Sequence, residues 1–309
     1  MNLPARGRAA GKVILLGEHA VVYGRPALAA ALALGLEVEV TVRSGALRIE
    51  SDLPALADDP RPAALAAEAA RALGLEPDGL SIRIRSELPA GAGLGSSAAL
   101  AIAVLRALAA AAGRRLGRDE ELALGRRLEA IFHGHPSGID PAAASATGSG
   151  LIHFVRGEPP TVTALRTARP LPLVIALGPP RSTGAAVGGL RARWEADRAR
   201  HERLFDEVGA VVEAGARAAA AGDLPALGRA FDENQALLGA LGVSAPEVEA
   251  LARAARDAGA LGAKLTGGGA GGAVIALAAE PERVAARLRT RQVETIVVRV
   301  GTAEEGKAA

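Results

Sequence analysis

The segment PAGAGLGSSAA, residues 89–99, combines three glycines with two serines. The glycines permit positive φ and let backbone amides approach a ligand closely. The serines open an Ala/Leu-rich helical run, and the first amides of a helix favour an anion. The spacing fits neither a Walker loop, which needs Gly-Lys-Ser/Thr, nor the Gly-x-Gly-x-x-Gly fingerprint. The segment therefore predicts a phosphate-binding loop of another kind, with a tight strand-to-helix connection as the alternative.

Three further segments combine polar side chains with glycine or proline. They are GKVILLGEHAVVYGRPALA (residues 11–29), HPSGIDPA (135–142) and KLTGGGAGG (264–272). The Pro-Ser-Gly turn presents Asp140, which suits either chemistry or capping of the helix-competent residues that follow. The glycines of the last segment suit close backbone approach to a ligand or a plain connection.

Strands and helices must position these segments. Hydrophobic patterning predicts that strands precede helices in the first half, and that the second half is α+β. The expected strands cover residues 12–17, 33–51 (two strands broken at 44–45), 81–88, the apolar run after 172, 272–278 and 294–300. The expected helices cover residues 96–112, 119–133 (beginning with an Asp cap), 184–221 and 245–258.

Length and composition predict two domains. The chain has 309 residues, 50% of them hydrophobic and only 2% aromatic, so its cores are aliphatic and large. A Pro-, Arg- and Thr-rich stretch at residues 155–172 precedes a fresh apolar strand. We therefore expect an N-terminal domain over 1–168 and a C-terminal domain over 169–309.

Charge and cysteine usage exclude several classes of function. The formal net charge is +2, without a block of like charges, and aromatic residues are few, so a nucleic-acid partner is not expected. There are no cysteines, which excludes disulfides, thiolate metal sites and cysteine nucleophiles. The apolar runs are too short for a signal peptide or a membrane span. A cytoplasmic protein without a membrane partner is expected.

The four glycine-containing segments resemble, in order and spacing, the signature motifs of the GHMP kinases. This superfamily includes galactokinases, homoserine kinases, phosphomevalonate kinases and mevalonate kinases, and the forms GEHAVVYG and PSGID are most similar to the last of these. The resemblance implies an α+β, two-domain GHMP kinase fold with the active site in the interdomain cleft. It also implies ATP and mevalonate as substrates, Mg²⁺ as cofactor and a homodimer as one possible assembly.

The implied reaction is ATP-dependent phosphorylation of the primary hydroxyl of mevalonate, giving 5-phosphomevalonate for isoprenoid precursor synthesis. One alternative is a GHMP kinase for another small alcohol: phosphomevalonate, a sugar or homoserine. Another is a non-catalytic nucleotide-binding regulator. Retention of Lys12, Glu129 and Asp140 together favours a kinase, because a binding module has no need of the aspartate.

The resemblance also assigns roles to individual residues. Asp140 matches the catalytic aspartate and Lys12 a lysine beside it, so an acceptor hydroxyl would lie between an ammonium and a carboxylate. Ser97 and Glu129 match the two Mg²⁺ ligands, and their oxygens suit that ion. Ser96 is either near the phosphates or only a helix cap. The ATP-binding residues implied are Pro89, Gly91, Gly93, Leu94, Gly95, Ser96, Ser97 and Ala98.

The acceptor-binding residues implied by the resemblance come from three segments. His19 is expected to contact the carboxylate or a hydroxyl of mevalonate, with a structural histidine as the alternative. His135 stands where many mevalonate kinases have Asn, which leaves the acceptor less defined than the kinase class. The full substrate-binding set is Glu18, His19, Arg181, Thr183, Gly267 and Gly268.

Overall fold

The computed structural model describes residues 1–52, 59–89, 91–133, 136–146, 148–178, 183–269 and 272–301. Two compact units emerge, and they are interleaved along the chain. Unit 1 consists of Met1–Lys12, Leu34–Ala90 and Gly95–Ala146, and unit 2 of Val13–Ala33, Gly91–Leu94 and Thr147–Ala309. Strands β1 (Ala5–Leu16) and β2 (Ala27–Val42) contribute residues to both. The division at residue 168, which assumes consecutive domains, stays a prediction.

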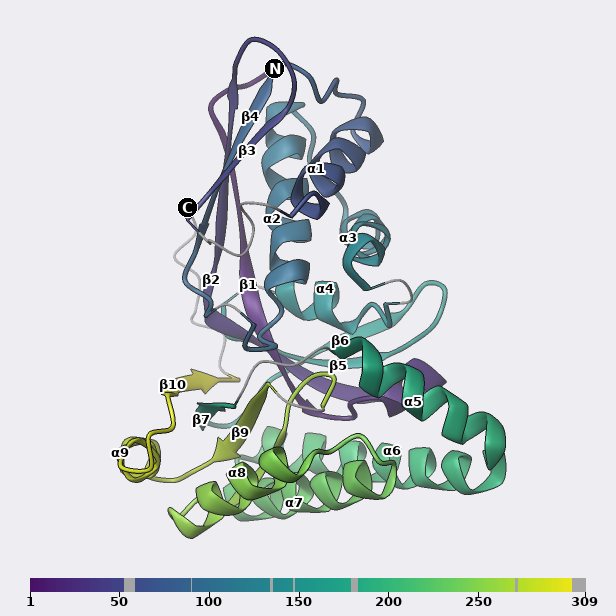
Figure 1. The fold of residues 1–309 in the computed structure, drawn as a ribbon, viewed down its shortest axis with the longest axis vertical. Coiled ribbons are helices and arrows are strands. Elements are labelled where there is room, and N and C mark those ends of the chain that lie inside the picture. The colour runs from purple at the N-terminus through teal and green to yellow at the C-terminus, as the bar shows by residue number, and fades with distance from the viewer. Residues whose placement is uncertain are drawn as a thin grey trace. The chain divides into compact units, whose positions relative to one another are not determined.

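Unit 1 contains a sheet and helices that lie along one side of the strands in Figure 1. The second part of β2 pairs antiparallel with β4, and β3 pairs parallel with β4. The remaining elements of this unit are β3 (Arg48–Ser51), α1 (Arg61–Ala72), β4 (Leu80–Ser86), α2 (Ser96–Ala111), α3 (Arg118–His133) and α4 (Ile139–Ala144).

The sheet of unit 1 buries one face, as alternating hydrophobicity predicts. Val38, Val40, Ile82 and Ile84 are buried, while the residues between them on β2 and β4 are charged. Glu39 stands opposite Arg83 in the antiparallel register. The core therefore lies between the sheet and the helices, and the polar face is a ladder of opposite charges.

Two expectations for unit 1 are wrong in detail. Strands do not all precede helices, because α1 connects the parallel strands β3 and β4. A parallel pair needs a crossover connection, which here contains α1. Helix α3 begins at Arg118, so Asp119 lies in the first turn and does not cap the helix. A carboxylate in the first turn still stabilises the helix through the helix dipole.

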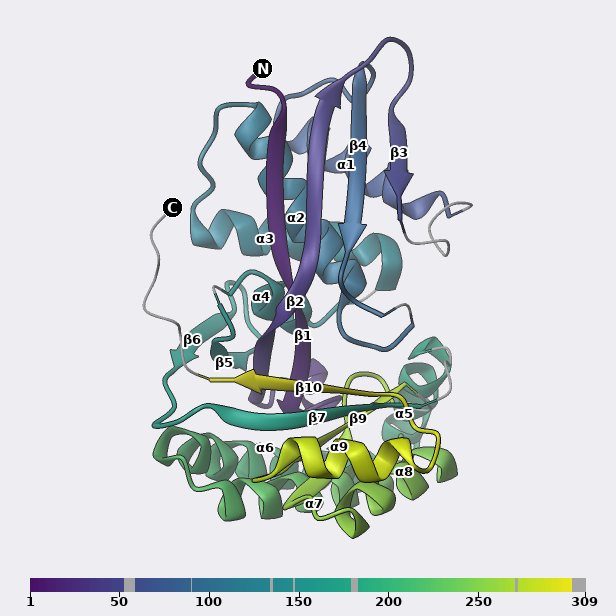
Figure 2. The same cartoon turned by 90° about the vertical axis from the view of Figure 1, so that its left-hand side faces the viewer.

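Unit 2 contains a four-stranded antiparallel sheet in the order β10-β7-β9-β8. Figure 2 shows β10 alongside β7, and α9 packs against both. The elements are β5 (Leu151–Val155), β6 (Thr161–Leu165), β7 (Leu171–Leu177), α5 (Thr183–Ala196), α6 (Arg198–Ala221), α7 (Leu224–Ala240), α8 (Pro246–Asp257), β8 (Gly262–Leu265), β9 (Ala273–Leu277), α9 (Pro281–Arg289) and β10 (Thr295–Val300).

The helix expected over residues 184–221 is two helices. The chain breaks at Asp197, which caps α6 by accepting a hydrogen bond from the amide of Arg200 at 3.1 Å. An aspartate at such a cap satisfies one of the first amides of the new helix. Among the described residues, no helix is both long and apolar enough to span a membrane.

Candidate active site

The glycine-serine loop leads into α2 as predicted, but its cap is a glycine. Gly95, with φ of +80°, is the N-cap of α2 and has no side chain to bond to the first amides of the helix. Ser96 is already the first helical residue, so its interpretation as a helix cap is wrong. The first amides of a helix have no intrahelical acceptor, which leaves this end suited to an anion.

The position of the Lys12 side chain requires a glycine at residue 95. A Cβ at position 95 would lie 2.6 Å from Cγ and 2.9 Å from Cε of the Lys12 side chain. The lysine stem therefore runs directly over the glycine, and its Nζ reaches Oδ2 of Asp140 at 3.1 Å. Lys12 is 4% exposed and Asp140 25%, so the ammonium is buried while the carboxylate still meets solvent.

Asp140 does not cap its helix. The N-cap of α4 is Gly138, with φ of +91°, and Asp140 lies in the first turn. The preceding turn is held by Ser137, whose Oγ accepts a hydrogen bond from the amide of Ile139 at 3.4 Å. The carboxylate of Asp140 is thus directed to Lys12 instead of to its own backbone, as a catalytic role requires.

One face of α3 completes this group. Gly125, Glu129 and His133 are spaced by four residues and so share a face. A Cβ at Gly125 would lie 2.7 Å from Cδ1 of Ile102 and 3.2 Å from Cβ of Pro141. The glycine therefore allows α3 to approach α2 and α4 closely. That approach brings Glu129 and His133 toward the helices that carry the other site residues.

Glu129 is a buried carboxylate with spare bonding capacity. It is 2% exposed, and among the described residues its Oε2 has no hydrogen-bond partner. Burial raises its pKa well above the usual value, and the charge of Asp140 adds to this while Lys12 opposes it. An unsatisfied buried carboxylate oxygen is costly unless a cation or donor meets it. Glu129 therefore fits as an oxygen ligand of a divalent cation.

His133 is a site residue that sequence reasoning missed. Its Nε2 lies 3.0 Å from Oγ of Ser97. His133 is an exposed residue, and partial desolvation of its ring lowers its pKa; Lys12 and Arg61 lower it further, and Asp140 works in the opposite direction. The imidazole is therefore neutral at neutral pH. Its position four residues after Glu129 was the signal that could have revealed it.

A second group of predicted residues lies in unit 2. Glu18 is fully buried and forms an ion pair with Lys264, whose ammonium also donates to the carbonyl of Leu265. Burial lowers the pKa of Lys264, and Glu18 counteracts this. Because neither side chain meets solvent, the pair ties the end of β1 to β8. Lys264, which sequence reasoning left without a role, is the partner of a predicted substrate residue.

His19 is neutral and held by the last glycine segment. Its backbone has φ of +63°, and its Nε2 lies 3.1 Å from the carbonyl oxygen of Gly268. A carbonyl only accepts, so Nε2 carries the proton and Nδ1 is left as an acceptor. Burial lowers the pKa of His19 to about 4, Lys264 and Arg193 also lower it, and the Gly268 carbonyl raises it. A cationic contact to a carboxylate is thus disfavoured, and a hydroxyl donor fits better.

Two glycine loops meet in unit 2. A Cβ at Gly267 would lie 3.7 Å from the carbonyl oxygen of Gly93, and both glycines have positive φ. Thr266 anchors this contact, because its Oγ1 accepts from the amide of Ile14 at 2.9 Å and donates to the carbonyl of Ile14 at 3.0 Å. Gly93, Gly267 and Gly268 are therefore adjacent through backbone contacts.

The remaining predicted residues divide into two sets. Leu94 and Ala98 are buried, whereas Gly91 is exposed and Pro89 half-buried. Arg181 and His135 lie outside the described residues, and of Thr183 only the backbone, which begins α5, is described.

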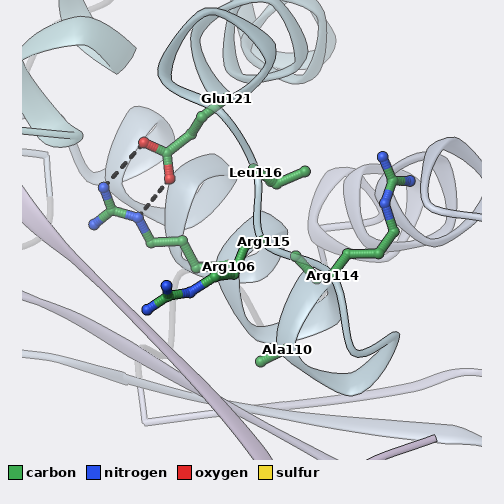
Figure 3. A pocket seen from close by; sticks show the side chains of 7 residues that line it. Arg106, Ala110, Arg114, Arg115, Leu116 and Glu121 are labelled. Carbon is green, nitrogen blue, oxygen red and sulfur yellow. Dashed lines mark hydrogen bonds and ion pairs between the residues drawn. The ribbon is translucent and has the colours of Figure 1, made fainter.

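A hollow of about 390 Å³ lies at the other end of α2 from Ser97, about 20 Å along that helix. Figure 3 shows Arg106 in this hollow, bonded to Glu121. Arg106 also donates to the carbonyls of Arg8 and Ser145. The hydrogen bonds of Arg106 connect strand β1, helix α2 and helix α3. We therefore assign this hollow a structural role and not a ligand-binding role.

The described residues contain no cluster of three or more His, Cys, Asp or Glu side chains able to hold a metal. A dedicated protein cage is therefore absent from this part of the chain. Magnesium in phosphoryl-transfer enzymes is typically held by one or two side chains together with substrate phosphates. The pair of Ser97 and Glu129 fits that pattern.

Comparison with known proteins agrees with this arrangement. Residues 62–149 match the GHMP kinases N terminal domain, and residues 216–294 match the GHMP kinases C terminal domain. A mevalonate kinase from Thermococcus onnurineus is 36% identical over 304 residues, covering 89% of each chain. One from Aeropyrum pernix is 34% identical over 300 residues, covering 91% of each chain.

Solved structures agree on the fold. The L. major mevalonate kinase, solved with R-mevalonate, matches with a TM-score of 0.85 and 28% identity, covering 98% of this chain and 100% of that one. A Lactococcus lactis galactokinase matches with a TM-score of 0.78 at 19% identity, covering 98% of this chain and 95% of that one, and shows the fold alone. The chain has the predicted two-domain α+β fold and belongs to the mevalonate kinase family of the GHMP kinases.

Proposed function

We propose that this enzyme transfers the γ-phosphoryl group of ATP to the primary hydroxyl of mevalonate, giving 5-phosphomevalonate. The observation that carries the proposal is the contact between the buried ammonium of Lys12 and the partly exposed carboxylate of Asp140. Family membership supports the acceptor, because mevalonate kinases 36% identical to this chain cover most of its length.

The pair acts on the acceptor hydroxyl from two sides. As the oxygen–phosphorus bond forms and the bond to the leaving ADP oxygen breaks, Asp140 receives the hydroxyl proton. The ammonium of Lys12 stabilises the negative charge that develops on the acceptor oxygen. Because the transition state of phosphoryl transfer is loose, the positioning of this oxygen contributes more than early removal of its proton.

The metal and nucleotide belong to the start of α2. Ser97 and Glu129 would hold Mg²⁺, which supplies charge neutralisation on the phosphates when bound. The amides at the start of α2 would bind phosphate oxygens, helped by the positive end of the helix dipole. Gly95 keeps this turn compact and leaves room for the lysine stem.

Residues of unit 2 are proposed to recognise the acceptor. His19 would accept a hydrogen bond from a mevalonate hydroxyl at Nδ1, since its Nε2 is engaged by Gly268. Glu18 is buried against Lys264, so we expect it to act by holding the backbone before His19. Arg181 and Thr183 stay predictions, as does the homodimer.

The experiment is a coupled ADP-release assay of the purified protein with ATP and Mg²⁺. The acceptors are mevalonate, phosphomevalonate, galactose and homoserine, and mass spectrometry identifies the product. We expect turnover with mevalonate and a product one phosphoryl group heavier. Turnover with another acceptor alone would keep the kinase class and overturn the assignment of substrate, whereas no turnover with any would favour a nucleotide-binding regulator.

A further inference from the structure

The contact between Ser97 and His133 has no part in the chemistry described above. Oγ of Ser97 and Nε2 of His133 are 3.0 Å apart, a good hydrogen-bond distance. The two residues come from different helices, α2 and α3. Gly125, eight residues before His133 on the same face, brings these helices close together. The contact is thus supported by the packing of both helices.

The direction of this hydrogen bond decides what Ser97 can offer a cation. A serine hydroxyl has one proton and two lone pairs. If Nε2 donates, one lone pair is consumed and the hydroxyl proton still needs an acceptor. If Ser97 donates to a deprotonated Nε2, both lone pairs remain available. A serine that ligates a metal is better served by the second arrangement.

We propose that His133 is a positioning residue that accepts the hydroxyl proton of Ser97 at Nε2 and thereby aims the serine oxygen at the metal. The inference rests on the proposed role of Ser97 as a metal ligand. It adds a group that touches neither substrate nor metal but orients a ligand, as partners of metal ligands commonly do.

Glu129 supports the inference from the same helix. It lies one turn before His133 on the same face of α3, and its buried Oε2 has no hydrogen-bond partner among the described residues. One helical face therefore supplies both a carboxylate ligand and the acceptor that orients the hydroxyl ligand. A change at His133 should for this reason affect cation binding and leave recognition of the acceptor alcohol intact.

The test measures binding of Mn²⁺, the probe for Mg²⁺, by electron paramagnetic resonance in the presence of ATP and without any acceptor. His133→Leu should weaken Mn²⁺ binding by about 10- to 100-fold, the range for loss of a partner of a metal ligand. His133→Gln, whose amide oxygen can accept from Ser97, should restore most of the affinity. The KM for the acceptor should change by no more than about twofold in both variants, which is small compared with the expected loss of Mn²⁺ affinity.

A double-mutant cycle with Ser97→Ala tests whether the two residues act as one. In the Ser97→Ala background, His133→Leu should weaken Mn²⁺ binding no further, because there is no hydroxyl left to orient. His153→Leu is the matched control, since His153 is paired with Glu213 in unit 2 and that change should leave Mn²⁺ binding unaltered. Losses that multiply in the double variant would overturn the proposal.

Nitrogen NMR of the wild-type protein provides a readout that depends on no variant folding. With ¹⁵N-labelled histidine, His133 should appear as a neutral ring with its proton on Nδ1. A proton on Nε2 would make the imidazole the donor and would overturn the proposal. The Mn²⁺ binding tests use no acceptor. Their result therefore does not depend on whether mevalonate is the substrate.

Discussion

Replacing Gly95 with alanine should damage catalysis through Lys12. The new Cβ would lie 2.6 Å from Cγ and 2.9 Å from Cε of that side chain, about 1 Å inside the favourable carbon–carbon separation. The lysine stem must therefore move by roughly 1 Å, and its ammonium loses its place beside Asp140. A misplacement of this size near the reacting atoms costs about 100-fold in rate. We expect kcat to fall by about that factor.

Gly93→Ala is the matched control for the backbone cost. Both glycines have positive φ, at +72° and +80°, so each alanine should destabilise the fold by about 1–2 kcal/mol. Among the described residues, the nearest atom to a Cβ at Gly93 would be the carbonyl oxygen of Thr266, at 3.9 Å. Gly93→Ala should therefore raise the KM for ATP, if the loop approaches the phosphates, while kcat falls much less.

The assay compares kcat, the KM for ATP and the thermal midpoint of both variants with those of the wild type. The two midpoints should fall by similar amounts, and only Gly95→Ala should lose kcat about 100-fold. Equal losses of kcat in the two variants would refute the reasoning, because the shared backbone strain would then explain both. Asp140→Asn in the Gly95→Ala background should add less than it does alone, since both changes act on one ion pair.

Three further outcomes are expected. Glu129→Gln should raise the Mg²⁺ concentration needed for half-maximal activity at least tenfold, and unchanged metal dependence would remove it from the metal site. Because burial lowers the pKa of His19 to about 4, its contribution to stability is complete above pH 6.5 and is lost as the pH falls through 4; urea unfolding at pH 7 and 5 should show this loss in the wild type and not in His19→Gln. Lys264→Met should cost about 3–5 kcal/mol of unfolding free energy, because it removes the ammonium paired with the buried carboxylate of Glu18, and adding Glu18→Gln should recover most of it.

Local signals in the sequence were sufficient for most elements near the site. The alternation of Ser81–Leu88 predicted β4, and the Ser-Ser start with its apolar run predicted α2 to within one residue. Helix α1 was not predicted although Gly74 follows its end, and the break at Asp197 was not predicted because the helical pattern continues on both sides of it. Whether such helices form, and where they end, depends on tertiary packing and on capping residues.

The candidate site residues were assigned from a resemblance, and their geometry was not predicted. The resemblance to the GHMP kinase motifs indicated Lys12, Ser97, Glu129 and Asp140, and the structure brings Lys12 to Asp140. The sequence places His133 on the face of Glu129, but its contact with Ser97 depends on the packing of α3 against α2, which Gly125 allows. The neutral state of His19 likewise depends on burial, which no local pattern reveals.

The most direct test of the central claim is a rapid-quench measurement of single-turnover phosphoryl transfer to mevalonate. It compares the wild type with Lys12→Met, Asp140→Asn and the double variant, all at saturating ATP and Mg²⁺. If the buried ammonium and the carboxylate act together on one hydroxyl, each single change should slow transfer by orders of magnitude, and the double variant should be no slower than the worse single one. Losses that multiply in the double variant, or a single variant with near-normal transfer, would contradict the account.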